Sequence, residues 1–212
     1  AYRWLKAGFR VLIGSRQAEK AEAAAAAIKQ LVGPGADVQG LENRAATQLA
    51  DIAVLTVPFS AHRQTLEAVK DCLVGKILID VTVPLVPPKV TKVQMPPAGS
   101  AAQEAQEILG EQTQVVAAFQ NISYEHLLKD EGVGCDILVT GTSKPARTRV
   151  LTLVKAADMV GYDAGPIENS VVVEGLTSIL IGINKQFGIQ SAGIRITGIP
   201  DDSETLEKKM VS

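Results

Sequence analysis

The stretch "RVLIGSR", residues Arg10 to Arg16, decides how the rest of the chain is interpreted. An apolar run, Val11 to Ile13, ends at Gly14 and is followed by a hydroxyl and a cation. A short apolar run that stops at glycine is typical of a buried strand. Similar runs recur downstream and alternate with segments of helical period, so we interpret "RVLIGSR" as one strand of a βαβ series.

The alternation predicts the fold class. Strands are expected at 11–13, 37–39, 52–58, 76–82, 114–118 and 136–140, and helices at 17–32, 43–50, 60–73, 100–109, 144–159 and 168–187. The unalternated runs at 52–58 and 76–82 are typical of strands buried on both faces. Strands and helices in this order predict a parallel sheet with right-handed crossovers, that is, a doubly wound α/β sheet of the Rossmann type.

The predicted organisation has three parts. Residues 1–143 form the nucleotide-binding domain, and residues 144–200 form a small, mainly helical C-terminal region. Residues 201–212 are polar and form a flexible tail.

Composition limits the class of protein. The chain has 212 residues, of which 46% are hydrophobic and 21% charged, and its net charge is −2. That length suffices to bury about 70% of the unfolded surface. The charge balance excludes a strongly basic surface for nucleic acid or membrane. The two cysteines form no disulfide framework, which favours a reducing, cytoplasmic location.

The residues before "RVLIGSR" predict what should lie upstream. "AYRWLKAGF" has the pattern of the last turns of a helix that closes at Gly8. In a dinucleotide-binding sheet the first strand leads through G-x-G-x-x-G into such a helix, and the second strand follows. "RVLIGSR" is then the second strand. The central first strand and its glycine loop, about 15–20 residues, are expected to precede residue 1.

The end of this strand predicts a preference for one dinucleotide. An acidic residue there accepts from the ribose 2′-OH of NAD, whereas a cation accommodates the 2′-phosphate of NADP. This chain has no acid at the position. Ser15 can donate to a phosphate oxygen, Arg16 can bind it bidentately, and Lys20 lies one turn further on. The alternative is that Ser15 only caps the next helix and Arg16 is solvated; the alternating context favours the phosphate site.

A second candidate segment follows the strand at 52–58. Ligands of open α/β sheets bind outside the carboxyl ends of the strands, so Thr56, Val57 and Pro58 are candidates to line the nicotinamide side. The alternative, held equally, is that Pro58 begins a helix and Thr56 belongs to the core.

Acid–base machinery is sparse in the sequence. The two histidines are His62 and His126, and no zinc-protease, C-x-x-C or nucleophile-elbow motif occurs. We expect His62 to be a polar surface residue and His126 to be structural, with Glu125 and Asp130 on helix surfaces. No catalytic side chain and no metal site are predicted.

The helix expected at 168–187 is apolar around most of its surface, which is typical of a helix buried on more than one side. It is therefore a candidate homodimer interface; the alternative is burial within one subunit. Glu174, Asn184 and Lys185 interrupt the apolar surface and are candidates to reach the cleft or the interface.

These segments together resemble the F420H2:NADP oxidoreductases, reductases that use NADPH and the deazaflavin coenzyme F420. The matching pieces span nearly the whole chain in family order: "AGFRVLIGSRQAEKA", "ADIAVLTVP", "LIDVTVPLVPP", "VVAAFQNIS", "DAGPIENS" and "VVVEGLTSILIGINKQFG". The departure from the family pattern is the absent glycine loop.

The resemblance implies NADP and F420 as cofactors and assigns residues to each. Ser15, Arg16 and Lys20 would hold the 2′-phosphate, while Thr56, Val57, Pro58 and Val86 would lie along NADP. The segment Gln120, Asn121, Ile122 and Ser123 would meet the deazaflavin, and Ala192 and Gly193 would close over it.

Two other functions remain open at this stage. The same fold could reduce an imine, a carbonyl or a metal chelate with NADPH, or it could sense NADP without catalysis and bind a partner through its C-terminal helix.

Overall fold

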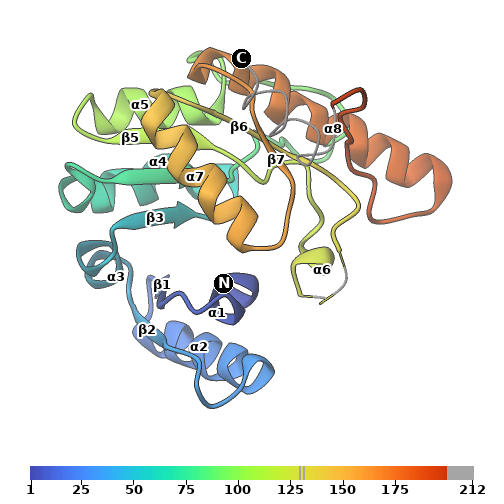
Figure 1. The fold of residues 1–212 in the computed structure, drawn as a ribbon. Coiled ribbons are helices and arrows are strands. Elements are labelled where there is room, and N and C mark those ends of the chain that lie inside the picture. The colour runs from blue at the N-terminus through green and yellow to red at the C-terminus, as the bar shows by residue number, and fades with distance from the viewer. Residues whose placement is uncertain (129, 131, 200–212) are drawn as a thin grey trace, which may run out of the picture.

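The computed structural model describes residues 1–128, 130 and 132–199, and Figure 1 shows their arrangement. The predicted tail at 201–212 lies outside the described residues. The strands are β1 (Val11–Ser15), β2 (Val38–Glu42), β3 (Ile52–Leu55), β4 (Ile77–Asp80), β5 (Gln114–Ala117), β6 (Ile137–Gly141) and β7 (Gly161–Asp163).

The helices alternate with these strands, as predicted. They are α1 (Tyr2–Lys6), α2 (Ala18–Val32), α3 (Asn43–Leu49), α4 (Phe59–Val69), α5 (Ala101–Leu109), α6 (Tyr124–Leu127), α7 (Lys144–Ala156) and α8 (Ser170–Phe187), with 3₁₀ turns η1 (Lys70–Leu73) and η2 (Ile167–Asn169). The sequence pattern did not indicate β7 or α6, because both are too short to carry a period.

β1 and β2 form a parallel pair that lies apart from the larger sheet in Figure 1, with Val11 opposite Val38 and Ser15 opposite Glu42. Helix α2 packs unusually close to this pair. A Cβ added at the buried Gly40 of β2 would lie 2.2 Å from the backbone nitrogen of Glu22. Glycine at this position therefore permits the close packing of α2 on β2.

The larger sheet has the order β3-β4-β5-β6-β7. Its pairs are parallel except β5–β6, which is antiparallel, with Ala117 opposite Thr140. The expectation of a parallel sheet needs correction here. No long helix carries the chain back across the sheet between β5 and β6 in the described residues, so β6 starts near the end where β5 stops.

No ladder of hydrogen bonds joins β1 to β3 among the strands that the structure describes. The existence of an upstream first strand stays a prediction. Burial on both faces was wrong for β3, because Ile52, Ala53 and Val54 are only half-buried at the edge of the sheet.

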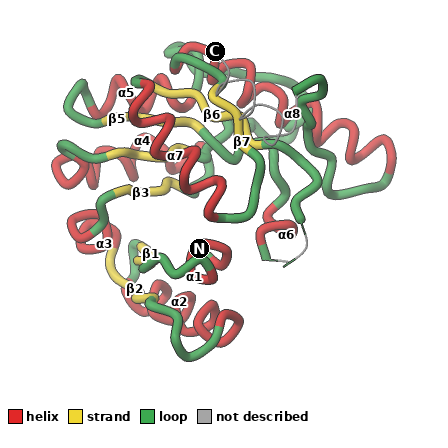
Figure 2. The backbone as a smooth tube through the Cα atoms, in the orientation of Figure 1, coloured by secondary structure: helices red, strands yellow, loops and turns green. Residues whose placement is uncertain are grey.

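Helices cover both faces of the five-stranded sheet (Figure 2). On one face, α4 and α5 pack through Leu66, Ala102 and Ala105 against Leu78 and Val115. On the other face, α7 packs against the sheet; the buried residues of this cluster include Ile79, Val116, Ile137, Val139, Val150 and Val154. The core is largely aliphatic.

Helix α8 packs one face into the protein, where Val173, Glu174 and Leu180 are buried. Its other face exposes Val171, Val172, Ile179, Ile183 and Phe187. The three-part division of the chain stays a prediction. No helix of the described residues is both long and apolar enough to cross a membrane.

Candidate cofactor-binding site

The carboxyl ends of β3, β4 and β5 lie side by side. Leu55 pairs with Asp80, and Asp80 pairs with Ala117, at the last positions of the three strands. The segments that follow therefore meet at one edge of the sheet, where ligands of open α/β folds bind. Thr56 and Pro58 are exposed there, Val57 is half-buried, and Val86 is exposed in the loop after β4.

The end of β1 presents the predicted phosphate-binding residues. Ser15 Oγ accepts from the backbone nitrogen of Gln17 at 3.3 Å, and Gln17 is the N-cap of α2. Ser15 therefore stabilises the turn before α2 without being its cap, and its hydroxyl proton is not used by this bond. Arg16 and Lys20 are exposed, and neither forms an ion pair with a residue that the structure describes. Free cations beside a half-buried hydroxyl suit a phosphate group.

The segment after β5 is held firmly from inside the protein. Phe119 has a φ of 72°, which is uncommon for a residue with a side chain. Gln120 is buried and its Nε2 donates to the backbone oxygen of Asp80 at 2.8 Å. Asn121 Nδ2 donates to the backbone oxygen of Val173 at 2.9 Å. These amide side chains point into the protein, so a ligand at this edge would meet the backbone of the segment and the half-buried Ile122 and Ser123.

Helix α8 completes this support. Asn121 Nδ2 also donates to Thr177 Oγ1 at 3.2 Å, and that hydroxyl donates to the backbone oxygen of Gln120 at 3.0 Å. The position of the Gln120–Ser123 segment therefore depends on the position of α8.

The C-terminal segment lies next to it. A Cβ added at Gly193 would be 2.5 Å from Cys135 Cβ and 3.8 Å from the backbone oxygen of Asn121. The backbone nitrogen of Ala192 donates to Asn184 Oδ1 at 2.9 Å, and that of Ile196 donates to Asp136 Oδ2 at 2.6 Å. The fold thus brings Ala192 and Gly193 beside Asn121, and Asn184 holds the segment.

The sequence analysis was wrong about His62, which has no exposed surface. Its Nε2 is 2.7 Å from Asp80 Oδ2, and its Nδ1 is 3.2 Å from Glu104 Oε1. Burial opposes the charged ring, but these two carboxylates outweigh burial and raise the pKa of His62. The signal was present in Asp80, an acid in the otherwise apolar run "ILID".

Glu174 of α8 is a second buried ionisable group at this end of the sheet. Its carboxylate oxygens accept from the backbone nitrogens of Ala101 at 2.7 Å and Ala102 at 3.1 Å, at the start of α5. Burial raises the pKa of Glu174 to about 8, against the effect of these two hydrogen bonds. Glu174 therefore reaches neither solvent nor an interface, and it connects α8 to α5.

Two buried polar atoms near the strand ends have no hydrogen-bond partner in the part of the chain that the structure describes: Thr82 Oγ1 and Gln120 Oε1. Both residues bond to Asp80, Thr82 through its backbone nitrogen and Gln120 through its side chain. Polar groups concentrate where β4 and β5 end, in contrast to the aliphatic core around them.

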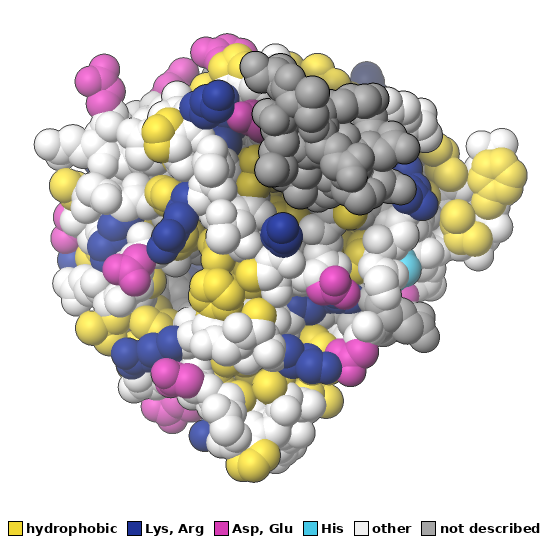
Figure 3. All heavy atoms as spheres, viewed as in Figure 1, with side chains coloured by type: hydrophobic (Ala, Val, Ile, Leu, Met, Phe, Trp, Pro, Cys, Tyr) yellow, Lys and Arg dark blue, Asp and Glu magenta, His cyan; other side chains and the backbone are white. Residues whose placement is uncertain are grey.

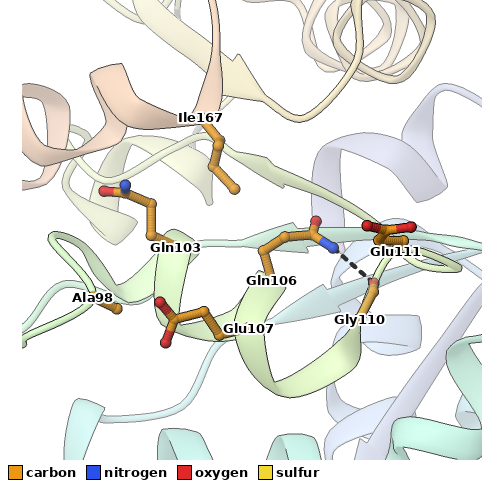
Figure 4. Close-up of a pocket in the computed structure, with 7 residues that line it drawn as sticks. All are labelled: Ala98, Gln103, Gln106, Glu107, Gly110, Glu111 and Ile167. Atoms are coloured by element: carbon orange, nitrogen blue, oxygen red, sulfur yellow. Dashed lines mark hydrogen bonds between the residues drawn. The ribbon is translucent and has the colours of Figure 1, made fainter.

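A surface hollow of about 380 Å³ lies elsewhere, along α5 (Figure 4). Gln103, Gln106 and Glu107 line it together with Ile167, and Gln106 Nε2 donates to the backbone oxygen of Gly110. None of the predicted site residues lines it. We place the candidate site at the strand ends, since the chemistry converges there.

Charge and metal-binding groups are distributed without a dominant cluster. On the face drawn in Figure 3, basic and acidic side chains are interspersed. Among the described residues no group of three or more His, Cys, Asp and Glu side chains is arranged to hold a metal ion.

A doubly wound sheet with charged and polar groups at its carboxyl edge defines the class of α/β dinucleotide-binding folds. Residues 1–84 match the family model described as NADP oxidoreductase coenzyme F420-dependent. The chain belongs to this family of F420-dependent NADP reductases, as its relatives confirm along almost its whole length.

The relatives include proteins named F420-dependent NADP reductase. The protein from Methanocaldococcus jannaschii is 38% identical over 198 residues, which cover 90% of this chain and 88% of the relative. The protein from Methanothermobacter marburgensis is 40% identical over 209 residues, covering 95% and 93%.

Solved structures confirm the fold class. A provisionally named F420-dependent NADP reductase from Arthrobacter sp. FB24 has a TM-score of 0.76 at 21% identity and covers 93% of this chain and 94% of its own. An imine reductase from Streptomyces aurantiacus has a TM-score of 0.54 at 17% identity, covering 88% and 56%. At these identities the likeness concerns the fold alone.

Proposed function

We propose that this protein transfers a hydride between NADPH and the deazaflavin coenzyme F420. Its family membership over 90% or more of the chain is the observation that carries this proposal. The relatives are named for the same pair of cofactors.

The residues at the carboxyl edge suit the two cofactors. Ser15, Arg16 and Lys20 offer a hydroxyl and two unpaired cations for the 2′-phosphate of NADP, and Thr56–Pro58 with Val86 would lie along its nicotinamide half. The segment from Gln120 to Ser123 would meet the deazaflavin, and Ala192 and Gly193 would cover it. The absence of a side chain at Gly193 lets this segment pack closely against Cys135, where an added Cβ would lie 2.5 Å from Cys135 Cβ.

The chemistry requires orientation more than acid–base groups. The nicotinamide and the deazaflavin, when bound, each give or accept a hydride at a ring carbon. The protein's part is to hold the two rings in reacting distance and to exclude water. The firmly held segment after β5 and the rigid sheet edge are suited to that part.

Absorbance of the oxidised deazaflavin tests the function directly. NADPH and F420 mixed with the protein should bleach this absorbance at a rate proportional to enzyme. Absence of bleaching at every pH from about 5 to 9 would contradict the proposal. Reduction of an imine, a carbonyl or a metal chelate without F420 would favour the other reductase class, and tight NADP binding without any turnover would favour a sensor.

We further infer a homodimer through α8 and a cytoplasmic location. The exposed apolar residues of α8 form a continuous helix face, which favours a second copy as its cover. Cys72 and Cys135 are both free thiols, which is compatible with a reducing compartment.

A further inference from the structure

We propose that His62, Asp80, Glu104 and Glu174, here called the His62 cluster, are positioning residues that fix the segments after β4 and β5 for hydride transfer. The proposal rests on the proposed function for its activity measurement. It does not concern residues that contact a cofactor.

The His62 cluster joins four elements at the cofactor end of the sheet. His62 lies on α4, which starts directly after Thr56–Pro58, and Asp80 is the last residue of β4. Glu104 lies in the first turn of α5, and Glu174 lies on α8. The two ring nitrogens of His62 bond to Asp80 and Glu104, while Glu174 accepts from the first backbone nitrogens of α5.

Asp80 connects the cluster to both candidate segments. Its Oδ1 accepts from the backbone nitrogen of Thr82 at 2.9 Å, which fixes the turn that leaves β4. Its backbone oxygen accepts from Gln120 Nε2 at 2.8 Å, which fixes the first residue of the segment expected to meet the deazaflavin. A shift of Asp80 would therefore move both cofactor-facing segments.

Glu174 supplies the second connection. Its immediate neighbour Val173 accepts from Asn121 Nδ2, and Thr177, one turn later, donates to the backbone oxygen of Gln120. The two hydrogen bonds of Glu174 thus fix the position of α8 relative to α5, and α8 in turn holds the segment after β5. The segment after β5 is therefore held on the sheet side by Asp80 and on the helix side by α8, which Glu174 joins to α5.

The charges that face one another in this cluster come from every element packed around it. His62 faces Asp80, Glu104 and Glu174, and Arg63 Nη2 lies 3.4 Å from Glu104 Oε2. The carboxylates of Asp80 and Glu104 favour the charged ring and raise the pKa of His62, while Glu174, with a pKa of about 8, is largely protonated at neutral pH. Above that pH Glu174 adds a negative charge to a buried site that already contains Asp80 and Glu104.

Because a displacement of about 1 Å in a reacting pair can reduce a rate about a hundredfold, small shifts of these segments should be visible in kcat. The experiment uses Asp80→Asn, which keeps the size and an acceptor for Thr82 but removes the charge opposite His62. Its matched control is Asp51→Asn, an exposed acid before β3 at the amino end of the sheet. Both are compared with the wild-type chain in the F420 bleaching assay, with circular dichroism confirming that each is folded.

We expect Asp80→Asn to lower kcat about ten- to a hundredfold while the KM for NADPH changes less than about threefold. Asp51→Asn should match the wild type. A folded Asp80→Asn protein with kcat within about twofold of Asp51→Asn overturns the proposal, because a residue with only a structural role changes stability and not turnover per folded molecule.

If Asp80→Asn does not fold, Glu174→Gln decides the question, since a neutral side chain of the same size imitates the protonated acid. Its kcat should lack the decline that wild type shows above about pH 8. The matched control is Glu111→Gln, on an exposed turn, which should keep the wild-type pH profile. Superimposable profiles for Glu174→Gln and wild type overturn the proposal.

A wild-type chain that does not bleach F420 refutes the proposed function and not the positioning role. Amide hydrogen exchange of the folded variants then tests the positioning role. The amides of residues 81–86 and 119–123 should exchange about tenfold faster in Asp80→Asn than in Asp51→Asn, and above about pH 8 they should exchange faster in the wild-type chain than in Glu174→Gln. Equal exchange in these segments overturns the positioning role.

Discussion

His62 Nε2 lies 2.7 Å from Asp80 Oδ2, and neither side chain is exposed to solvent. Burial disfavours the charged ring, but the carboxylates at both ring nitrogens raise the pKa of His62. A group whose pKa is raised by folding stabilises the folded state fully below its unfolded pKa, here 6.5, and loses that contribution as the pH rises through the folded value.

Stability should therefore fall with rising pH, and Glu174 should strengthen the trend. Folding raises the pKa of Glu174 from 4.5 to about 8, so the folded state binds more protons than the unfolded state between these values. At about 1.4 kcal/mol for each pKa unit, the loss between pH 5 and pH 8 amounts to a few kcal/mol at most. Thermal unfolding should give a lower Tm at pH 8.5 than at pH 5.5.

Glu174→Gln provides the control for this prediction, because glutamine does not titrate. The variant should show a flatter dependence of Tm on pH than the wild-type chain, with the difference concentrated between pH 5 and pH 8. A wild-type Tm that rises over this range, or identical slopes for both proteins, would contradict the assignment. The lowered pKa values of Asp71 and Asp163 act below this window, where acid removes their contribution.

The double substitution Ser15→Ala with Arg16→Ala should weaken NADPH binding about tenfold or more, because it removes a hydroxyl and a bidentate cation from the 2′-phosphate. Binding of NADH, which lacks that phosphate, should change little. Fluorescence titration with both dinucleotides measures the ratio. Arg10→Ala, at the amino end of β1 and 3.8 Å from Asp37, is the control and should leave both affinities unchanged. Equal weakening for NADPH and NADH refutes the phosphate site.

Gly193→Ala should raise the KM for F420 severalfold and leave the KM for NADPH unaltered. An added Cβ would lie 2.5 Å from Cys135 Cβ, so the segment proposed to cover the deazaflavin must move away from Cys135. Gly134→Ala is a matched control, since no atom lies within 4 Å of a Cβ built there. Steady-state kinetics with each cofactor varied in turn measures the two KM values. A KM for F420 equal to that of the wild type would exclude a covering role for Gly193.

Gly40→Ala should destabilise the protein by about 1–3 kcal/mol, the usual cost of overpacking. The added methyl group meets the backbone of α2 at Ala21 and Glu22, which cannot rotate out of the way as a side chain could. Urea unfolding compares the variant with Gly35→Ala, where the built Cβ has no neighbour within 4 Å. Equal midpoints for the two variants would show that α2 can shift freely on β2.

The pair Val172→Glu and Phe187→Glu should convert a dimer to a monomer if α8 forms the interface, since both side chains are mostly exposed in one subunit, at 63% and 67%. Sedimentation at several concentrations gives the assembly state. Leu31→Glu changes an equally exposed leucine on α2 and should leave assembly intact. A wild-type chain that is monomeric at all concentrations ends the dimer proposal.

The sequence predicted most of the sheet because apolar runs such as "ILID" and "QVVA" have the composition of buried strands whatever their partners. It did not predict the direction of β6, which depends on how the residues between β5 and β6 cross the sheet. It also missed the environment of His62. A helix position is buried or exposed according to what packs against it, and the partners Asp80 and Glu104 are distant in sequence.

Some features of the candidate site could likewise be predicted from local sequence, and others could not. Arg16 and Lys20 could be proposed from local sequence because a cation after the second strand of such a sheet can accommodate a 2′-phosphate, and this assignment stays a prediction. The inward orientation of Gln120 and Asn121 could not, because their partners come from β4 and α8.

Arg16 and Lys20 extend into solvent and contribute nothing to the packed interior, whereas Asp80 and Glu174 are surrounded by it. On the proposed assignment, the choice between NADP and NAD depends on exposed side chains outside the packed interior. On that assignment a few surface substitutions would change the preferred dinucleotide without altering the packed interior, whereas a change at Asp80 or Glu174 would disturb the buried contacts that hold the segments after β4 and β5.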